Sequence, residues 1–163
     1  MALVKDVMKT QLVTAEADES VAVVCRRMKQ HHLGAVLVMQ AGKMTGIFTE
    51  RDVLNRIVAE GRDPAQLTVK DVYTANPVAV KGGTSIKACA AILRKQGFRH
   101  LPVVDDSEHP VGIVSSRDFF QFMTDELEQV IDTFRKSGEK VEESFDPYEY
   151  LGAGGVGLPG TPE

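Results

Sequence analysis

The chain of 163 residues contains only two cysteines, Cys25 and Cys89. Two cysteines are too few for a disulfide framework, and neither belongs to a Cys-x-x-Cys pair. Both fall on apolar helix faces of the repeats described below. We therefore expect small buried hydrophobic residues here, rather than metal ligands or redox-active thiols.

Long hydrophobic runs and an excess of basic residues are also missing. No apolar stretch reaches the roughly 20 residues that span a bilayer, and charge interrupts residues 1–6 before a signal peptide forms. The net charge is −4. We expect a cytoplasmic protein that associates neither with membranes nor with nucleic acid.

The familiar catalytic signatures do not occur in the sequence. It has no Gly-x-x-x-x-Gly-Lys-Ser/Thr loop, no Gly-x-Gly-x-x-Gly after a predicted strand and no Gly-x-Ser-x-Gly elbow. Spacing alone indicates no nucleophile–base pair and no metal site. We therefore predict that the protein is not an enzyme and has no catalytic cofactor.

What the sequence does contain is an internal repeat. Val4-Lys5-Asp6-Val7 recurs 65 residues later as Val69-Lys70-Asp71-Val72. Gly46-Ile47-Phe48-Thr49-Glu50-Arg51-Asp52 recurs 66 residues later as Gly112-Ile113-Val114-Ser115-Ser116-Arg117-Asp118. The one-residue difference predicts an insertion in a hairpin turn at residues 105–109.

Each copy shows the same order of hydrophobic patterns. The first offset also relates two sets of residues with the i, i+3, i+4, i+7 spacing of an apolar helix face. These sets are Val21, Val24, Cys25 and Met28, and Ile86, Cys89, Ala90 and Leu93. A first strand (around 12–14 or 77–80) precedes each helix, and two further strands and a second helix follow it.

The repeat predicts the fold class and the domains. One copy of about 60 residues would bury too little surface alone. We expect an α/β (α+β) fold in which two β-α-β-β-α repeats pack about a pseudo-twofold axis. The first repeat is assigned to residues 1–66 and the second to 67–125. Residues 126–163 are expected to be a helix extension and a flexible glycine-rich tail.

The last predicted helix is longer than its counterpart in the first copy. Its apolar stripe runs to about Lys136 and consists of Phe120, Met123, Leu127, Ile131 and Phe134. An exposed stripe of this length needs apolar cover. We expect a homodimer, although the stripe could instead cover the chain's own core.

Two patterns allow both a structural and a functional interpretation. Thr49 with Asp52, and Ser115 with Asp118, are spaced as in a capping box at a helix start. A carboxylate beside a hydroxyl can also accept hydrogen bonds from the vicinal hydroxyls of a ribose. Arg99-His100 is either an incidental charged connection or a pair of phosphate donors.

Together these motifs resemble a tandem pair of cystathionine-β-synthase (CBS) domains, also called a Bateman module. The resemblance covers about residues 4–124. It implies a regulatory sensor that binds an adenosine-containing ligand, such as AMP, ADP, ATP or NAD, in clefts between the repeats. The regulated partner would be a separate, unknown protein.

The resemblance also implies roles for individual residues. Asp118 and Asp52 are similar to ribose-binding aspartates, Ser115 and Thr49 to the neighbouring hydroxyls, and Arg99 and His100 to a phosphate-binding pair. Candidate adenine contacts are Met8, Val13 and Thr14, and Arg51 and Arg117 could reach across the axis. Gly34-Ala35 leaves the first copy without the basic pair. The better cleft is therefore expected to combine Ser115, Asp118, Arg99 and His100.

Two rival functions remain at this point. The fold could serve as a dimerisation or interaction scaffold with empty clefts, or the ligand could be S-adenosylmethionine. An enzyme acting on a nucleotide is a third reading, which the missing acid–base constellation disfavours.

Overall fold

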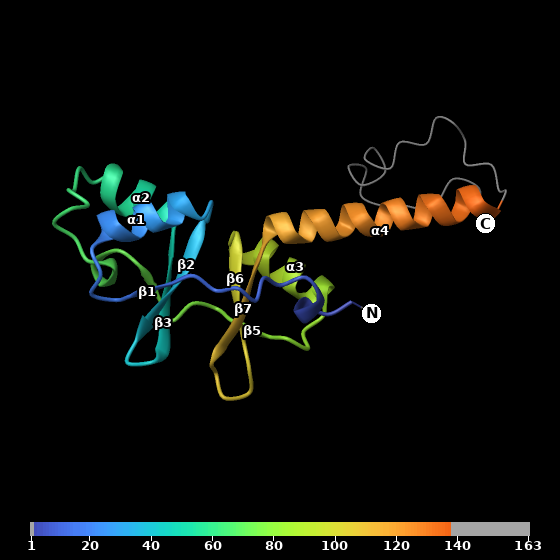
Figure 1. The fold of residues 1–163 in the computed structure, drawn as a ribbon, viewed down its shortest axis with the longest axis horizontal. Helices are drawn as coiled ribbons and strands as arrows, with labels where there is room; N and C mark the ends of the chain where they lie inside the picture. The colour runs from blue at the N-terminus through green and yellow to red at the C-terminus, as the bar shows by residue number, and fades with distance from the viewer. Residues whose placement is uncertain (1, 138–163) are drawn as a thin grey trace. The chain divides into compact units, whose positions relative to one another are not determined.

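The strands and helices of both repeats appear in the predicted order in the computed structural model, which describes residues 2–137 (Figure 1). In chain order these are β1 (Thr14–Glu16), α1 (Val21–Gln30), β2 (Ala35–Gln40), β3 (Lys43–Thr49), α2 (Glu50–Val53), β4 (Thr74–Ala75), β5 (Val80–Lys81), α3 (Ile86–Gln96), β6 (His100–Val104), β7 (Pro110–Ser115) and α4 (Ser116–Ser137). The mixed α and β fold class is confirmed. The first strands start later than expected, at Thr14 and Val80, because their pairing with β2 and β6 begins only there.

Both repeats belong to one compact unit, residues 1–119, and residues 120–163 form a second unit. The assigned repeat limits of 66/67 and 125/126 therefore stay a prediction. Within the second unit, α4 extends to Ser137, close to the predicted end. The glycine-rich tail lies outside the described residues. In the described part of the chain, no helix has the length and apolarity to cross a membrane.

The strands form two sheets, one built mainly by each repeat. The strand order is β1-β2-β3-β4 in one and β5-β6-β7 in the other. The first strand of each repeat is parallel to its neighbour, and the hairpin that follows is antiparallel. The β2–β3 turn has two residues with positive φ, Ala41 and Gly42, as a tight primed turn requires. The β6–β7 turn is longer, which confirms where the insertion lies.

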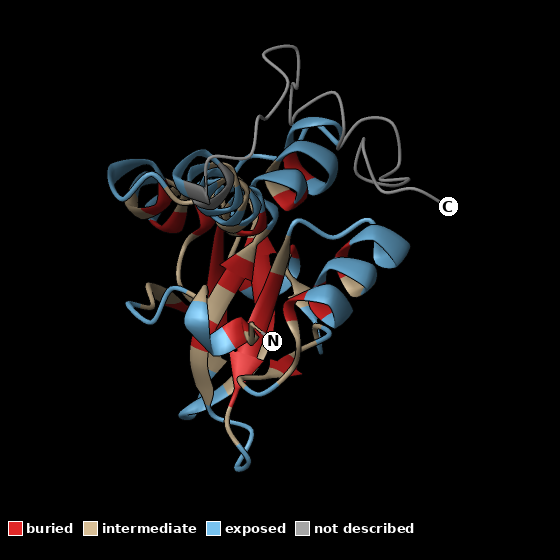
Figure 2. Ribbon diagram, turned by 90° about the vertical axis from the view of Figure 1, so that its right-hand side faces the viewer, coloured by how far each residue is buried: buried red, intermediate tan, exposed pale blue. Residues whose placement is uncertain are grey.

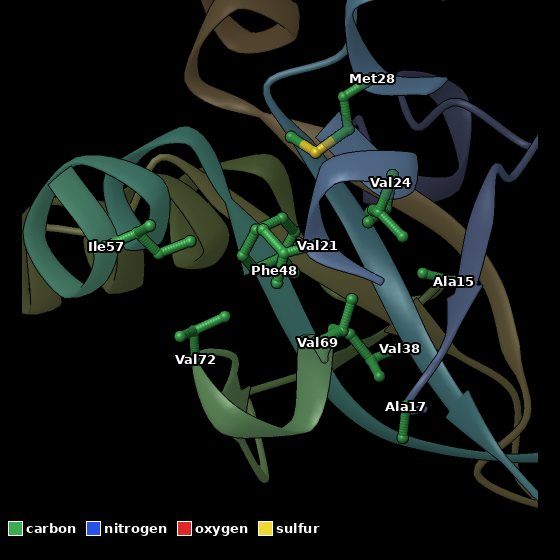
Figure 3. Packing of buried hydrophobic residues seen from close by; sticks show 11 residues of the cluster. Ala15, Ala17, Val21, Val24, Met28, Val38, Phe48, Ile57, Val69 and Val72 are labelled. Carbon is green, nitrogen blue, oxygen red and sulfur yellow. The ribbon is translucent and has the colours of Figure 1, made fainter. Parts of the chain in front are cut away.

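The segment that opens the second repeat packs into the core of the first (Figure 3). Val69 and Val72 have at most 1% exposure and lie in one cluster with Val21 and Phe48. Thr74 then pairs with β3 to give the fourth strand. Because this segment connects the repeats, the first repeat cannot complete its core without it.

The N-terminal segment plays the matching part for the second repeat. The Val4 amide donates to the Thr84 carbonyl at 2.8 Å. Lys9 pairs with Ile113 of β7, as Thr74 pairs with β3. The N-terminal segment thus extends the sheet of the second repeat, and residues 74–75 extend the sheet of the first. These crossed contacts join the repeats into one unit, residues 1–119.

The helices bury narrow apolar faces, and Figure 2 shows the buried residues concentrated on the strands and inner helix faces. All of the predicted face of α1 is at least partly buried. On α3, Ala90 is exposed, contrary to the prediction, because only the narrower stripe of Ile86, Cys89 and Leu93 packs inward. Burial raises the pKa of the Cys25 and Cys89 thiols, as expected of small core residues.

Gly46 should not tolerate a side chain. A Cβ at this position would lie 1.9 Å from the Tyr73 ring and 2.8 Å from the Thr74 carbonyl oxygen. We expect Gly46→Ala to lower the free energy of unfolding by about 1–3 kcal/mol, the usual cost of overpacking. Urea denaturation measures this. Gly83→Ala is the control, since a Cβ there meets nothing within 4 Å. Equal stability of Gly46→Ala and wild type would contradict this packing.

Candidate functional site

A cavity of about 230 Å³ lies in the first unit, between elements of both repeats. Its volume is just below the roughly 300–1,000 Å³ of typical ligand pockets. The first repeat contributes Gly34, Ile47, Thr49, Glu50, Arg51, Asp52, Asn55 and Arg56. Residues after the first repeat contribute Thr74, Val78, Phe98, Arg99 and His100. The cavity therefore joins a hydroxyl–carboxylate pair from one repeat to a basic pair from the other.

Thr49 and Asp52 form the predicted capping box at the start of α2. The Asp52 Oδ2 atom accepts from the Thr49 backbone amide at 2.9 Å and from the Thr49 hydroxyl at 2.7 Å. The Thr49 hydroxyl in turn accepts from the Asp52 amide at 3.3 Å. The structural interpretation is thus confirmed, and the same geometry fixes the carboxylate at the cavity wall.

The second oxygen of Asp52 is held from outside the box. Thr74 donates its hydroxyl to Asp52 Oδ1 at 3.2 Å, and the Arg56 Nε atom lies 3.3 Å from the same oxygen. Arg56 belongs to a π-helical segment, Leu54–Val58, that continues α2. It also donates to the carbonyls of Val72 and Tyr73. Arg56 thus ties α2 to the segment leading into β4.

The two basic residues enter the cavity at the start of β6. His100 faces Gly34, where a Cβ would lie 3.3 Å from both the His100 ring and the Glu50 carboxylate. The sequence interpretation treated Gly34 as a lost basic residue. In the structure the missing side chain instead leaves room for His100, because even a Cβ here would be in tight contact with the ring.

His100 is half-buried and surrounded by charges. Burial is the main cause that lowers its pKa, and the nearby Arg99 and Lys9 act in the same direction. The negative charges of Glu50 and Asp118 oppose this effect. The folded protein therefore favours a neutral His100, and an anion in the cavity would favour the charged form.

The second hydroxyl–carboxylate pair lies at the start of α4. Asp118 Oδ2 accepts from the amide and hydroxyl of Ser115, as in the first repeat. Its Oδ1 atom lies 3.5 Å from the Lys9 ammonium. Neither Ser115 nor Asp118 lines the cavity. The cavity combines Arg99 and His100 with Thr49 and Asp52, because the start of β6 lies against Gly34 before β2. His100 is also paired with Ser115 in the β6–β7 register, and the charge of Asp118 acts on it. The expected grouping of the basic pair with Ser115 and Asp118 therefore stays a prediction.

Of the remaining candidates, only Arg51 lines the cavity. Arg51 lines the cavity and reaches the other repeat by donating to the Gly97 carbonyl at 3.0 Å. Met8, Val13, Thr14 and Arg117 do not line it. Met8 packs over Gly112, and the Thr14 carbonyl accepts from Arg27. Val13 packs against the core cluster of the first repeat.

Sequence reasoning also missed several cavity residues. The 65-residue offset relates Val13 to Val78 and Lys9 to Thr74, so the repeat itself carried the signal for these two. Arg56 had no such signal, since its counterpart 66 residues later is Phe122. Among the described residues, no group of three or more His, Cys, Asp or Glu side chains could hold a metal ion.

The model of the CBS domain family matches the chain twice, over residues 4–59 and 69–125. The chain belongs to the CBS domain family. Its two CBS repeats are 34% identical over 118 residues to the CBS domain-containing protein YhcV of Bacillus subtilis, covering 72% of this chain and 83% of that protein. They are 31% identical to CBSCBSPB1 of Arabidopsis thaliana over 64% of this chain, but only 19% of that longer protein.

Solved CBS structures share the fold. The CBS-domain containing protein ATU1752 of Agrobacterium tumefaciens is 29% identical, with a TM-score of 0.70 over 75% of this chain and 99% of that chain. The CBS domain pair of protein MJ0100, in complex with 5′-methylthioadenosine and S-adenosyl-L-methionine, is 25% identical, with a TM-score of 0.69 over 75% and 99% of the two chains.

The lowered pKa of His100 makes the stability of the CBS pair depend on pH. The pKa of His100 in the folded protein lies below its value of about 6.5 in the unfolded chain. The stability that the neutral ring contributes is therefore fully present above about pH 6.5. It is lost as the pH falls through the folded pKa, because the unfolded chain then binds the proton more readily. We expect the melting temperature to fall less between about pH 7 and pH 5 in His100→Gln than in the wild type.

His31→Gln is the matched control, because His31 is exposed at the end of α1. Its melting temperature should follow the wild-type pH profile. Thermal denaturation at a series of pH values measures all three proteins. A His100→Gln profile parallel to that of the wild type would show that protonation of His100 does not affect folding.

Proposed function

We propose that this CBS pair is a regulatory module that binds an adenine nucleotide (AMP, ADP, ATP or NAD) in the cavity and signals to a partner protein by conformational change. The observation that supports this most is the joint cavity wall. It holds a hydroxyl–carboxylate pair for ribose, Thr49 and Asp52, and a basic pair for phosphate, Arg99 and His100.

The cavity has a wall suited to each part of such a ligand. Ile47, Val78 and Phe98 offer apolar surface for the base. The charged wall residues are three arginines, at 51, 56 and 99, and two carboxylates, at 50 and 52. The excess of positive charge favours an anionic phosphate.

S-adenosylmethionine is the second candidate ligand. It is favoured by the MJ0100 domain pair, whose structure holds both this compound and 5′-methylthioadenosine. Both candidate ligands contain adenosine, so the same ribose and adenine contacts would serve either one. The arginine-rich wall argues for phosphate, because the sulfonium of S-adenosylmethionine is positively charged and would meet like charge.

The proposed signal follows from the fact that both repeats line the cavity. A ligand that contacts Asp52 and Arg99 together links α2 to the start of β6. Such a ligand binds more tightly to the arrangement of the repeats in which both residues can reach it. It therefore shifts the protein toward that arrangement. We infer a role in the cytoplasm, acting on a separate protein.

The proposed module catalyses no reaction. Both threonine hydroxyls in the cavity wall, those of Thr49 and Thr74, donate to the Asp52 carboxylate. A buried carboxylate held by a helix cap is a binding group rather than a mobile base. Steady hydrolysis of ATP by the pure protein, lost in Asp52→Asn, would contradict this.

Arg99→Ala should separate phosphate binding from nucleoside binding. A charge-assisted hydrogen bond to phosphate contributes about 1.5–3 kcal/mol, roughly ten- to a hundredfold in affinity. We expect Arg99→Ala to weaken AMP by this factor and adenosine much less, as measured by calorimetry. Arg94→Ala, an exposed arginine of α3 outside the cavity, is the control. Equal loss of AMP and adenosine in Arg99→Ala would remove Arg99 from the phosphate site.

We also propose that the protein is a homodimer that covers the apolar face of α4. Phe120 is 66% exposed and Met123 45% exposed on this helix. Leu127 and Ile131 are partly exposed, and the Phe134 side chain lies outside the described part. Burying large apolar side chains of this kind is the usual driving force for association.

Changing the exposed face of α4 should therefore separate the subunits. We expect light scattering to give the mass of a dimer for the wild type and of a monomer for the double variant Phe120→Glu, Met123→Glu. Gln121→Glu adds a charge to the same helix at an exposed polar position and is the control. A monomeric wild type at micromolar concentration would contradict the proposal.

A further inference from the structure

Three hydrogen bonds and one ion pair hold the Asp52 carboxylate. An ionised carboxylate offers about four acceptor positions on its two oxygens. Oδ2 receives the amide and the hydroxyl of Thr49. Oδ1 receives the Thr74 hydroxyl and faces Arg56 Nε. Arg56 also donates to the Thr74 hydroxyl at 3.2 Å, which closes the network.

This occupancy matters because Asp52 is only 6% exposed. A buried carboxylate depends on its hydrogen bonds, and losing one without replacement is costly. A ribose hydroxyl that binds Asp52 Oδ1 must compete with the Thr74 hydroxyl or with Arg56 for that oxygen. Displacing Arg56 breaks the ion pair between its guanidinium and the Asp52 carboxylate, and a neutral ribose hydroxyl does not replace that positive charge.

Asp118, the matching residue of the second repeat, is not closed in this way. Its Oδ2 atom is held by Ser115 as in the first repeat. Its Oδ1 atom lies 3.5 Å from the Lys9 ammonium, and its charge also acts on His100. The Lys9 side chain is 60% exposed, so it can move away at little cost. The residue at the position of Arg56 is Phe122, which has no donor.

We propose that Arg56 is a specificity-determining residue that makes the Asp52 cavity select phosphorylated nucleosides over nucleosides. The inference rests on the nucleotide-binding function proposed above. Arg56 lines the cavity and its side chain is 45% exposed, so its guanidinium is accessible to a ligand. A phosphate gives the guanidinium a new anionic partner and so compensates for its release from Asp52. Adenosine offers no such partner and must compete with Arg56 for the carboxylate.

Arg56 differs in this role from Arg99. Arg99 attracts phosphate, whereas Arg56 both attracts phosphate and blocks the ribose site when phosphate is absent. The two residues therefore predict different results. Loss of Arg99 weakens the binding of AMP without strengthening that of adenosine. Loss of Arg56 weakens the binding of AMP and also strengthens that of adenosine.

Calorimetry with adenosine and ADP tests this in the full chain. All proteins carry Asp118→Asn, so that Asp52 is the remaining ribose carboxylate. We expect the parent protein to bind ADP at least about tenfold more tightly than adenosine. In Arg56→Met we expect this ratio to fall by about tenfold or more, with adenosine tighter and ADP weaker. Arg94→Met, which removes an exposed arginine outside the cavity, should leave the ratio unchanged.

Arg56→Lys covers the case in which Arg56→Met does not fold, since Arg56 also holds the carbonyls of Val72 and Tyr73. Lysine keeps the positive charge for phosphate but lacks the fork of donors. We expect tighter adenosine with nearly unchanged ADP, and a melting curve for each variant verifies folding. An unchanged ADP-to-adenosine ratio in the folded variants would overturn the role of Arg56 alone. A parent protein that binds neither ligand would overturn the proposed function of the cavity as well.

Discussion

The packing of Val69 and Val72 into the core of the first repeat determines how the first unit is arranged. Full burial of a valine side chain contributes about 1.5–3 kcal/mol, so the two together hold this segment firmly. The chain that follows is directed along β3 as β4, which brings Thr74 onto Asp52. The N-terminal segment reaches Thr84 and Ile113 in the same way. The cavity exists because these connections keep the two repeats together.

Sequence differences between the repeats then make the two carboxylate sites unequal. Gly34 stands where the second repeat has Arg99, and the space it leaves is occupied by the His100 ring. Thr74 stands where the first copy has Lys9, and Arg56 where the second has Phe122. The first site is therefore buried and closed by a hydrogen-bond network, while the second depends on one exposed lysine. One symmetric fold thus offers two chemically different positions for a ligand.

Much of the fold could be predicted from the repeat, because helix faces and buried strands leave direct periodic signals. Val21, Val24 and Met28 lie in the core as their spacing predicts. The partners of the basic pair could not be predicted. Periodicity assigns a residue to an element but does not say which elements of two repeats meet, and Arg99 was therefore grouped with Asp118 of its own repeat. Arg56 was missed for another reason, because it departs from the repeat and so has no counterpart to draw attention to it.

A crystal structure of the protein in complex with ADP tests the central claim most directly, namely that the two repeats form one nucleotide site across their boundary. We expect electron density for the nucleotide in the cavity, with the ribose near Thr49 and Asp52 and the phosphates beside Arg99 and His100. Density for the ligand only beside Ser115 and Asp118, with this cavity empty, would contradict it.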